Sequence, residues 1–449
     1  MMMIIDVEPV HAVGALSGTG FLVASAIKVL AVFSVLMVVV ALLTLLERKV
    51  SAWMQDRLGP NRVGPGGLGQ PLADGVKNIL KEETNPAEAH GIFFTLAPML
   101  SIIPALVTFA IIPFAAPLPT PWGLVPMVVA DVPIGVLFLL AFSSLGVYGI
   151  VIAGWSSANK YALLGGLRAG AQMISYEIAL GLSLLGVFFL VGNVTLPEVI
   201  WTQQRMHLWF ALPLALSFLF FWISAFAETN RLPFDLPEAE SELVTGYHTE
   251  YSSMKFSMFF IAEYAHVLTI SALMATLFLG GWDIPGWQGD NMLAVGGAVL
   301  GAEPAWWKTL LTFGAFALKT LFFIMVFMIV RWTVPRFRYD QVMDLGWKIL
   351  LPTALAAVVV TAATILALES AGGPFVTYSG VGDGLRPYIS IWGGLVLTAV
   401  NLAMLAAVVW LMDSGRELGG SGSLTERRLR AREIARRRAA AIPIPAQRN

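Results

Sequence analysis

The chain has 449 residues, of which 57% are hydrophobic and only 13% are charged, and its formal net charge is −1. A soluble domain carries charge on about a quarter of its residues, so most of this surface must face an apolar medium. The composition excludes an ordinary soluble protein and predicts a membrane protein. The sequence has no cysteine, which excludes disulfides and sulfur-ligated zinc or iron–sulfur sites.

The histidines do not suggest another kind of redox centre. There are five of them, and no two lie three or four residues apart. We therefore expect no metal and no bound cofactor in this chain. If it takes part in electron transfer, the electrons must come from another protein.

Nine apolar segments are close to the length of about 20 residues that a helix needs to cross a membrane. They are residues 25–46, 92–113, 131–153, 176–191, 209–227, 256–280, 308–331, 349–368 and 391–412. The fourth is short, and its helix is expected to extend back into 167–175. The chain is therefore predicted to be an all-α, polytopic membrane protein.

Lys and Arg are distributed unevenly between the two sides of this bundle. The segments after spans one, three, five, seven and nine hold 23 of them, and the opposite side holds four. Because basic loops remain in the cytoplasm, the N-terminus is expected outside and the C-terminus inside. The Arg-rich tail is expected to be a solvated helix or a disordered anchor at the cytoplasmic surface.

The segment after the first span contains a predicted surface helix. Seven Gly and Pro residues between Gly59 and Gly69 indicate an irregular backbone. Pro71 then opens a short helix with polar residues on one face. Its apolar residues share the other face, as in helices that lie at a membrane surface; they are Leu72, Val76, Ile79 and Leu80.

The segment after the fifth span, residues 228–255, holds six acidic residues and only two basic ones. Glu238 and Glu242 are four residues apart, so a helix would place them on one face, where repulsion should raise the pKa of at least one. Such a cluster can hold and pass protons near neutral pH. The simpler interpretation is a solvated acidic loop that contacts a basic partner.

Among the charged residues within predicted spans, Glu177, Glu263 and Lys319 stand out, and His266 follows Glu263 by three residues. A charge at membrane depth costs about 2.5 to 3.5 kcal/mol, which marks it as a functional candidate. These groups suit a proton relay. The alternative is a structural ion pair, for example between Lys319 and a glutamate of a neighbouring span.

The segment after the seventh span, residues 331–348, combines arginines with aromatic residues. A basic–aromatic cluster at the cytoplasmic face binds lipid head groups by default. Docking of a peripheral subunit is the second interpretation.

Three runs of the sequence are similar to signatures of a known family. They read GPNRVGPGGLGQPLADGVKNILKEETNP, AETNRLPFDLPEAESELVTGYHTEY and RFRYDQVMDLGWK. They resemble the H subunit of the proton-pumping type I NADH:quinone oxidoreductase, respiratory complex I, whose mitochondrial counterpart is subunit 1. The resemblance covers about residues 20–368.

The resemblance implies a bundle of eight tilted helices, of which spans two to six resemble an antiporter half-channel. An extra loop and a ninth span depart from the family pattern. The expected divisions are an outer N-terminal segment at 1–24, the quinone-channel domain at 25–368, the extra loop and helix at 369–412, and the Arg-rich cytoplasmic tail at 413–449.

The resemblance also implies a function, as a membrane subunit of NADH:quinone oxidoreductase. The subunit would form the channel by which quinone enters and part of the chamber wall, and would link quinone reduction to proton translocation through carboxylates. Quinone would be the substrate, with FMN and iron–sulfur clusters in partner subunits. The expected partners are peripheral-arm subunits bearing the terminal cluster, small membrane subunits and antiporter-like subunits, in a bacterial cell membrane.

Particular residues acquire roles through the same resemblance, and no metal site is among them. Carboxylates leading from the chamber toward the antiporter-like subunits, with one aromatic partner, would be Glu177, Glu228, Asp235, Glu238, Glu240, Glu242, Glu263 and Tyr176. Residues on the quinone side would be Arg48, Arg57, Asp74 and Arg231. The resemblance implies no role for Lys319.

Two other interpretations stay open. One is a sister complex of the same ancestry, such as a membrane-bound hydrogenase or a ferredoxin- or coenzyme-linked dehydrogenase, although the full GPNRVGP and ETNRLPFDLPEAE runs favour a quinone enzyme. The other is a stand-alone ion or solute transporter, which charged residues within the membrane permit. Against it stand the lack of a sequence repeat and the long loops on one side, which are typical of a docking platform.

Overall fold

The computed structural model describes residues 18–120, 123–287, 289–291, 304–379, 386–413 and 432–433. Nearly all regular structure in these ranges is helical, which confirms the predicted fold class. Most of the predicted N-terminal segment and of the Arg-rich tail lies outside them.

Eight helices in the described ranges are long and apolar enough to cross a membrane, and they confirm eight of the nine predicted spans. They are α1 (Gly18–Met54), α3 (Gly91–Val107), α4 (Gly135–Ser156), α5 (Lys160–Val191), α9 (Ser253–Phe278), α11 (Trp306–Thr333), α12 (Tyr339–Asp344) continuing through a π-helical turn (Leu345–Leu350) into α13 (Leu351–Ala371), and α14 (Ile391–Asp413).

The fifth predicted span is shorter than expected. Its helix, α7, covers only Ala215–Glu228, 14 residues, and residues 209–214 before it are mostly in turns. Pro213 lies in this stretch and has no N–H to donate to a preceding turn. The fourth span is longer than expected, because α5 begins at Lys160, where the side chain of Asn159 accepts a hydrogen bond from the Tyr161 N–H.

The remaining elements are short and lie between the long helices. They are α2 (Gln70–Leu80), α6 (Leu196–Met206), α8 (Glu240–Leu243) and two antiparallel hairpins, β1 (Ala115–Thr120) with β2 (Gly123–Met127) and β3 (Val376–Ser379) with β4 (Arg386–Ile389). The predicted surface helix is confirmed as α2. The hairpins were not predicted, since apolar runs interrupted by proline read as loops.

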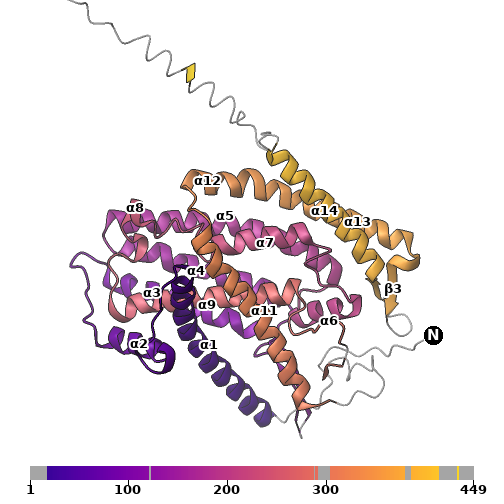
Figure 1. Ribbon diagram of the computed structural model, residues 1–449, viewed down its shortest axis with the longest axis horizontal. Coiled ribbons are helices and arrows are strands. Elements are labelled where there is room, and N and C mark those ends of the chain that lie inside the picture. Colours follow the sequence, from indigo (N-terminus) through magenta and orange to yellow (C-terminus); the bar gives the residue numbers. More distant parts are fainter. Residues whose placement is uncertain are drawn as a thin grey trace, which may run out of the picture.

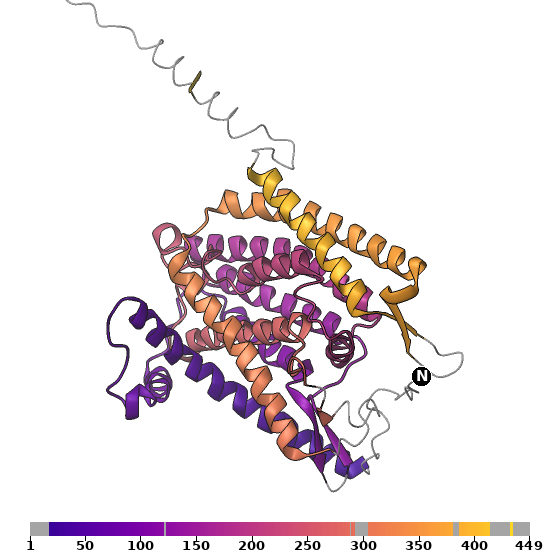
Figure 2. The same ribbon diagram turned by 45° about the vertical axis from the view of Figure 1, so that its right-hand side comes forward.

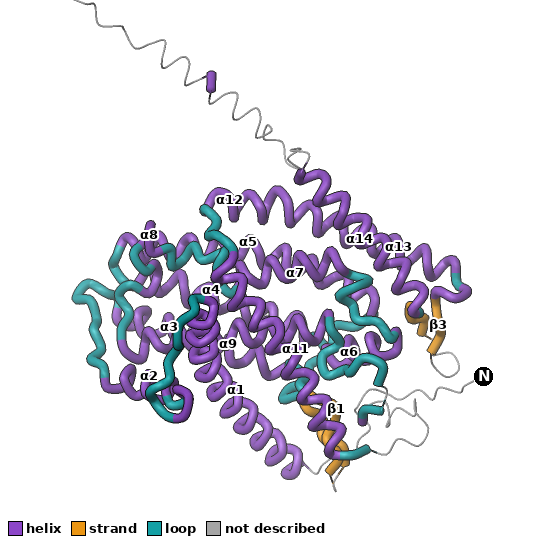
Figure 3. Tube along the Cα trace, in the orientation of Figure 1, coloured by secondary structure: helices purple, strands orange, loops and turns teal. Residues whose placement is uncertain are grey.

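The long helices form a bundle in which two members cross the rest obliquely. Figure 1 shows α5, α7 and α9 running side by side, with α1 and α11 inclined across them. In Figure 2, α13 and α14 lie together along one side of the bundle, and α14 also packs against α7. Figure 3 shows both hairpins at the end of the bundle opposite α2 and α8.

The bundle buries its largest side chains between α5, α7 and α9 and leaves apolar residues on its outer helices. Phe221 and Phe278 are fully buried in the main core, whereas Leu318 of α11 and Leu366 of α13 are 69% and 65% exposed. Water would penalise this outer surface, at about 25 cal/mol per Å², but lipid does not. The fold therefore has the apolar exterior of a membrane-spanning bundle.

Candidate functional site

A large cavity, here called the end cavity, opens where α1 and α11 end beside the first half of α9, near the Gly- and Pro-rich segment after α1. Its volume is about 720 Å³. Arg48, Arg57 and Arg331 line it together with Glu47 and Tyr264. Two residues predicted on the quinone side, Arg48 and Arg57, therefore border one polar space.

A second cavity, the side cavity, lies between α1, α2 and α9 and has a volume of about 310 Å³. Its walls are mainly apolar, with Val40 of α1, Ile79 of α2 and Phe260 of α9 among them. Its polar part is formed by Arg48 and Asp74, whose guanidinium and carboxylate are 2.7 Å apart. Because Arg48 also lines the end cavity, this ion pair lies where the two spaces approach each other.

Five buried or half-buried side chains connect α1, α9 and α11 at the end cavity; we call Glu47, Arg231, Glu263, Tyr264 and Arg331 the arginine cluster. Arg231 donates to Glu47 at 3.2 Å and to Glu263 at 2.8 Å. Glu47 also accepts from Arg331 and, at 2.7 Å, from the Tyr264 hydroxyl. The Arg231 guanidinium lies 4.5 Å from the centre of the Tyr264 ring, a cation–π contact.

The segment between α7 and α9 is folded inward instead of being solvated. Gly246 has a φ of +67°, and a side chain there would collide with the Pro237 carbonyl oxygen, so only glycine fits. Asp235 is buried and receives a hydrogen bond of 2.7 Å from Arg336. For Asp235, the basic partner suggested by the simpler interpretation is thus an arginine of this same chain.

Enclosure by the protein perturbs several titratable groups of this segment. Burial, assisted by repulsion from Glu263 and Asp235, raises the pKa of Glu238 to about 8. Burial also raises the pKa of Asp235, although Arg336 opposes the shift, and lowers the pKa of His248 to about 4. Burial alone would lower the pKa of Arg231, but Glu263 and Glu47 raise it above its usual value. Glu238 is thus mainly protonated at neutral pH.

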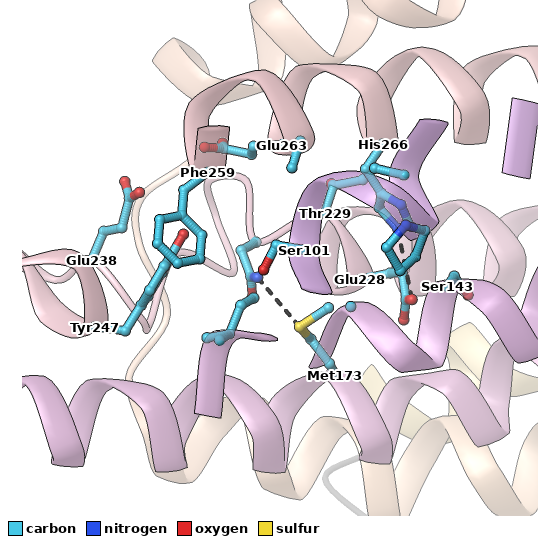
Figure 4. Close-up of a pocket in the computed structure, with 16 residues that line it drawn as sticks. Ser101, Ser143, Met173, Glu228, Thr229, Glu238, Tyr247, Phe259, Glu263 and His266 are labelled. Carbon is cyan, nitrogen blue, oxygen red and sulfur yellow. Dashed lines mark hydrogen bonds and ion pairs between the residues drawn. The ribbon is translucent and has the colours of Figure 1, made fainter. Parts of the chain in front are cut away.

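A third, smaller space lies behind the arginine cluster, between α3, α4, α7 and α9, and is called the inner cavity. Its volume is about 60 Å³, enough for a few water molecules, since each needs roughly 10–15 Å³. Figure 4 shows Glu238 at one end, Glu263 beside it, and Glu228 facing His266 at the other. Three predicted carboxylates therefore share one enclosed space.

Glu177 and Tyr176 of α5 occupy different environments. The Glu177 carboxylate is close enough to Glu228 and His266 for electrostatic interaction, which extends the series of carboxylates to α5. Tyr176 is fully buried, and its hydroxyl donates to the Val342 carbonyl at 2.9 Å. Its contact therefore fixes α12 against α5.

The predicted pairing of Glu238 with Glu242 on one helix face is wrong. The helix α8 begins only at Glu240, so Glu238 precedes it. Glu242 forms an ion pair of 2.6 Å with Arg168 of α5, and half of its side chain is exposed. The pKa of Glu238 is raised, as expected for one member of the pair, but by burial, Glu263 and Asp235. The Glu240 side chain lies outside those that the structure describes.

Among the described residues, no glutamate pairs with Lys319. Its ammonium donates to the backbone carbonyls of Leu279, Gly281 and Asp283 at 2.6, 3.0 and 2.5 Å and lies over the Trp209 ring. These carbonyls belong to the segment that follows α9, so Lys319 of α11 holds this segment in place. Three backbone carbonyls therefore take the place of the glutamate partner that the alternative interpretation suggested.

Several residues of the site were not predicted as site residues. Glu47, Tyr264 and Arg331 complete the arginine cluster, Arg336 holds Asp235, and His266 faces Glu228. Two features of the sequence could have indicated them. Glu47 and Arg331 are charged residues at the ends of the first and seventh spans, and His266 follows Glu263 by one helical turn. Among the described residues, no group of three or more His, Asp or Glu side chains is arranged to hold a metal ion.

The fold and the site together define a polytopic membrane protein with a charged end cavity and buried carboxylates behind it. The sequence model of the family described as NADH dehydrogenase matches residues 27–362. The chain therefore belongs to this family, and the match ends within α13, so that α14 lies outside it.

Curated relatives narrow the assignment to one component of the complex, the H subunit of NADH-quinone oxidoreductase. The chain is 49% identical over 322 residues to this subunit of Protochlamydia amoebophila, covering 72% of this chain and 91% of the relative. It is 45% identical over 348 residues to the H subunit numbered 1 of Cytophaga hutchinsonii (77% and 98%) and 48% identical over 355 residues to the H subunit numbered 2 of Koribacter versatilis (76% and 97%). The similarity extends over 322 to 355 residues of the chain. The chain is therefore a membrane subunit of NADH-quinone oxidoreductase.

Proposed function

We propose that this chain forms the channel by which quinone enters the complex and part of the wall of the quinone chamber, and that its buried carboxylates link quinone reduction to proton translocation. The observation that carries the proposal is the position of Arg48. It lies at the junction of the apolar side cavity and the polar end cavity.

The side cavity suits the passage of a quinone. Its apolar walls between α1, α2 and α9 match an isoprenoid tail, and the exposed apolar face of α2 would lie in the lipid surface. The Arg48–Asp74 pair would meet the polar head group. Arg57 lines the end cavity beyond it, where partner subunits would complete the chamber.

The electrons would come from partners. Peripheral-arm subunits carrying FMN and iron–sulfur clusters would dock on this end of the bundle, with the terminal cluster next to the end cavity. Small membrane subunits and antiporter-like subunits would contact the long helices. The excess of Lys and Arg in the odd-numbered loops supports an orientation in a bacterial cell membrane with the N-terminus outside and the C-terminus in the cytoplasm.

The arginine cluster would couple the quinone to the carboxylates. Glu47 and Arg331 line the end cavity, Arg231 joins Glu47 to Glu263, and Glu263 lines the inner cavity. A change in charge or protonation of the quinone would alter the electrostatic potential along this series. Protons would then move between Glu238, Glu263, Glu228 and Glu177 toward the antiporter-like subunits.

The quinone route is tested by narrowing the side cavity in the intact complex. Ala41 lines it, whereas its neighbour Leu42 faces outward and is 41% exposed. We expect Ala41→Phe to raise the KM for a long-tailed quinone about tenfold, a change of roughly 1.4 kcal/mol in binding, and Leu42→Phe to leave it unchanged. Equal KM values for both variants and the parent would exclude this route.

The carboxylate path is tested by neutralising Glu228 or Glu263 with glutamine in the complex reconstituted in liposomes. We expect quinone reduction and proton pumping to fall together, while electron transfer from NADH to ferricyanide, which bypasses quinone, persists. Glu82, exposed outside all three cavities, provides the matched control Glu82→Gln. Parental pumping in both cavity variants would contradict the path.

A further inference from the structure

His266 has a position in the inner cavity that the series of carboxylates leaves unexplained. It lies on α9 one turn after Glu263, so both side chains reach the same face of the helix. Its Nε2 atom is 3.7 Å from Oε1 of Glu228, slightly beyond hydrogen-bonding distance. A shift of less than 1 Å would bring the two groups into direct contact.

Glu228 is buried, His266 is partly buried, and the facing atoms of both lack hydrogen-bonding partners among the described residues. Glu228 is 3% exposed. Among the described residues, neither of its carboxylate oxygens, nor Nε2 of His266, has a hydrogen-bonding partner. Buried polar groups are nearly always paired, and isolated buried charge is costly. Because no other hydrogen bond fixes the protonation of either group, a proton could reside on the Glu228 carboxylate or on the His266 imidazole.

We propose that His266 is a proton-relay residue that exchanges a proton with Glu228 within the inner cavity. The inference deepens the carboxylate path proposed above and rests on it. In the transfer, the Nε2–H bond of the imidazolium breaks and an O–H bond forms on the carboxylate. A positive and a negative charge disappear together, so the net charge of the cavity does not change, which limits the cost in a medium of low polarity.

The charged and titratable groups around His266 come from several elements. Glu263 lies on the same helix, Glu228 ends α7, Glu177 belongs to α5, and Glu238 lies in the segment before α9. From α3 and α4 the cavity receives polar hydroxyls, including that of Ser143. His266 is a basic group that lines the cavity with these carboxylates, on the same helix as Glu263 and facing Glu228 (Figure 4).

A second histidine–glutamate pair shows why proximity alone does not make a relay. His248 Nε2 is 3.8 Å from Glu238, but His248 does not line the inner cavity. Burial lowers the pKa of His248 to about 4 and raises that of Glu238 to about 8, so both groups are mainly neutral at pH 7. His248 is thus uncharged over the pH range in which the complex would work.

The test uses His266→Asn and His266→Gln in the intact complex, reconstituted in liposomes and supplied with NADH and quinone. His90→Asn is the matched control, because His90 is exposed and stacks on Trp155 away from the cavity. We expect the rate of quinone reduction coupled to proton pumping to fall at least about tenfold in both His266 variants, because a proton-transfer group has been removed. The remaining turnover should depend less on pH than that of the parent, because the exchanging imidazole is gone, whereas the control should match the parent.

The outcomes separate this inference from the function on which it rests. Parental rate and pH profile in the His266 variants, with Glu228→Gln impaired, would overturn the relay and leave the carboxylate path intact. Parental behaviour of both would overturn the path itself. If the His266 variants alone do not assemble, the double variant E228Q/H266N removes the buried charge. Turnover equal to that of Glu228→Gln alone would support a shared step, and a further loss of turnover beyond it would overturn it.

Discussion

The arginine cluster and the inner cavity hold buried carboxylates in opposite ways. In the arginine cluster, Glu47 receives hydrogen bonds from Arg231, Arg331 and Tyr264. In the inner cavity, Glu228 has no hydrogen-bonding partner among the described residues, and His266 is 3.7 Å away. Glu263 belongs to both regions, because it pairs with Arg231 and also lines the cavity.

The difference separates fixed charge from exchangeable protons. A carboxylate surrounded by charged donors keeps its charge, since each charge-assisted hydrogen bond favours the ionised form. A carboxylate that faces a small cavity and one imidazole has no such constraint. Glu47 and the two arginines would therefore transmit a change of potential without changing their own protonation, and the inner cavity would respond to it by moving protons.

Removing the centre of the arginine cluster should have the largest effect. Arg231→Leu leaves Glu47 and Glu263 without their common partner, and breaking a buried ion pair in this way costs about 3–5 kcal/mol. We expect little assembled complex on native gels and a much lower thermal midpoint. Arg231→Lys keeps the charge but loses the bidentate geometry, and should lie in between. Parental stability of Arg231→Leu would show that the cluster does not hold the fold together.

Neutralising one carboxylate in each region compares the two directly. Glu47→Gln weakens hydrogen bonds to charged groups, each worth about 1.5–3 kcal/mol, so the thermal midpoint should fall clearly. Glu228→Gln removes no hydrogen bond made by the protein, and we expect a change of less than about 1 kcal/mol despite its loss of coupled turnover. The reverse order of stabilities would contradict the comparison.

The sequence predicts the long helices well, because the thickness and apolarity of the membrane set the length and hydropathy that a spanning helix must have. It fails where a local feature overrides the average, as at Pro213, which lies in the turns before α7. Charges within the bundle could be found as candidates, but their partners could not. Arg168 lies in α5 and meets Glu242 across 74 residues, and no local pattern indicates such a contact.

The site was predictable in part of its membership but not in its arrangement. Glu228, Glu238 and Glu263 were predicted and do share the inner cavity. Whether a given carboxylate is paired depends on side chains from distant helices, such as Arg331, which reaches Glu47 on α1. In the sequence Glu263 lies within a predicted span and Glu47 directly follows one, and neither position reveals that Arg231 joins the two acids. Only the packing of α1, α9 and α11 distinguishes their environments.

A smaller, pH-dependent effect on stability is expected at Glu238, which lies at one end of the inner cavity. Its pKa is about 8 in the folded protein and about 4.3 in an unfolded chain. Between these values the folded state holds a proton that the unfolded chain has lost, so stability must decrease as pH rises. Glu238→Gln cannot release this proton, and its thermal midpoint should vary less between about pH 5 and 8.

Glu242 provides the control for this pH effect. Its side chain is 51% exposed and pairs with Arg168 on the surface of α5. Glu242→Gln should keep the pH dependence of the parent complex. Identical slopes for the Glu238 and Glu242 variants would show that enclosure of Glu238 does not set its protonation. Since 37% of the Glu238 side chain is accessible, the difference in slope should be modest.

The smallest effect on stability is expected at the junction of the side and end cavities, where the carboxylate is paired but accessible. Asp74→Asn weakens the ion pair with Arg48, whose side chain is 46% exposed, and such pairs contribute only about 0.2–1 kcal/mol. Asp344→Asn breaks a similar exposed pair with Lys348 at 2.7 Å, away from the three cavities. Thermal midpoints of the two variants should be nearly equal. The KM for quinone should rise only in Asp74→Asn, because Arg48 is then no longer held where the two cavities approach. An equal KM in both variants would separate this ion pair from quinone passage and leave it as an ordinary surface contact.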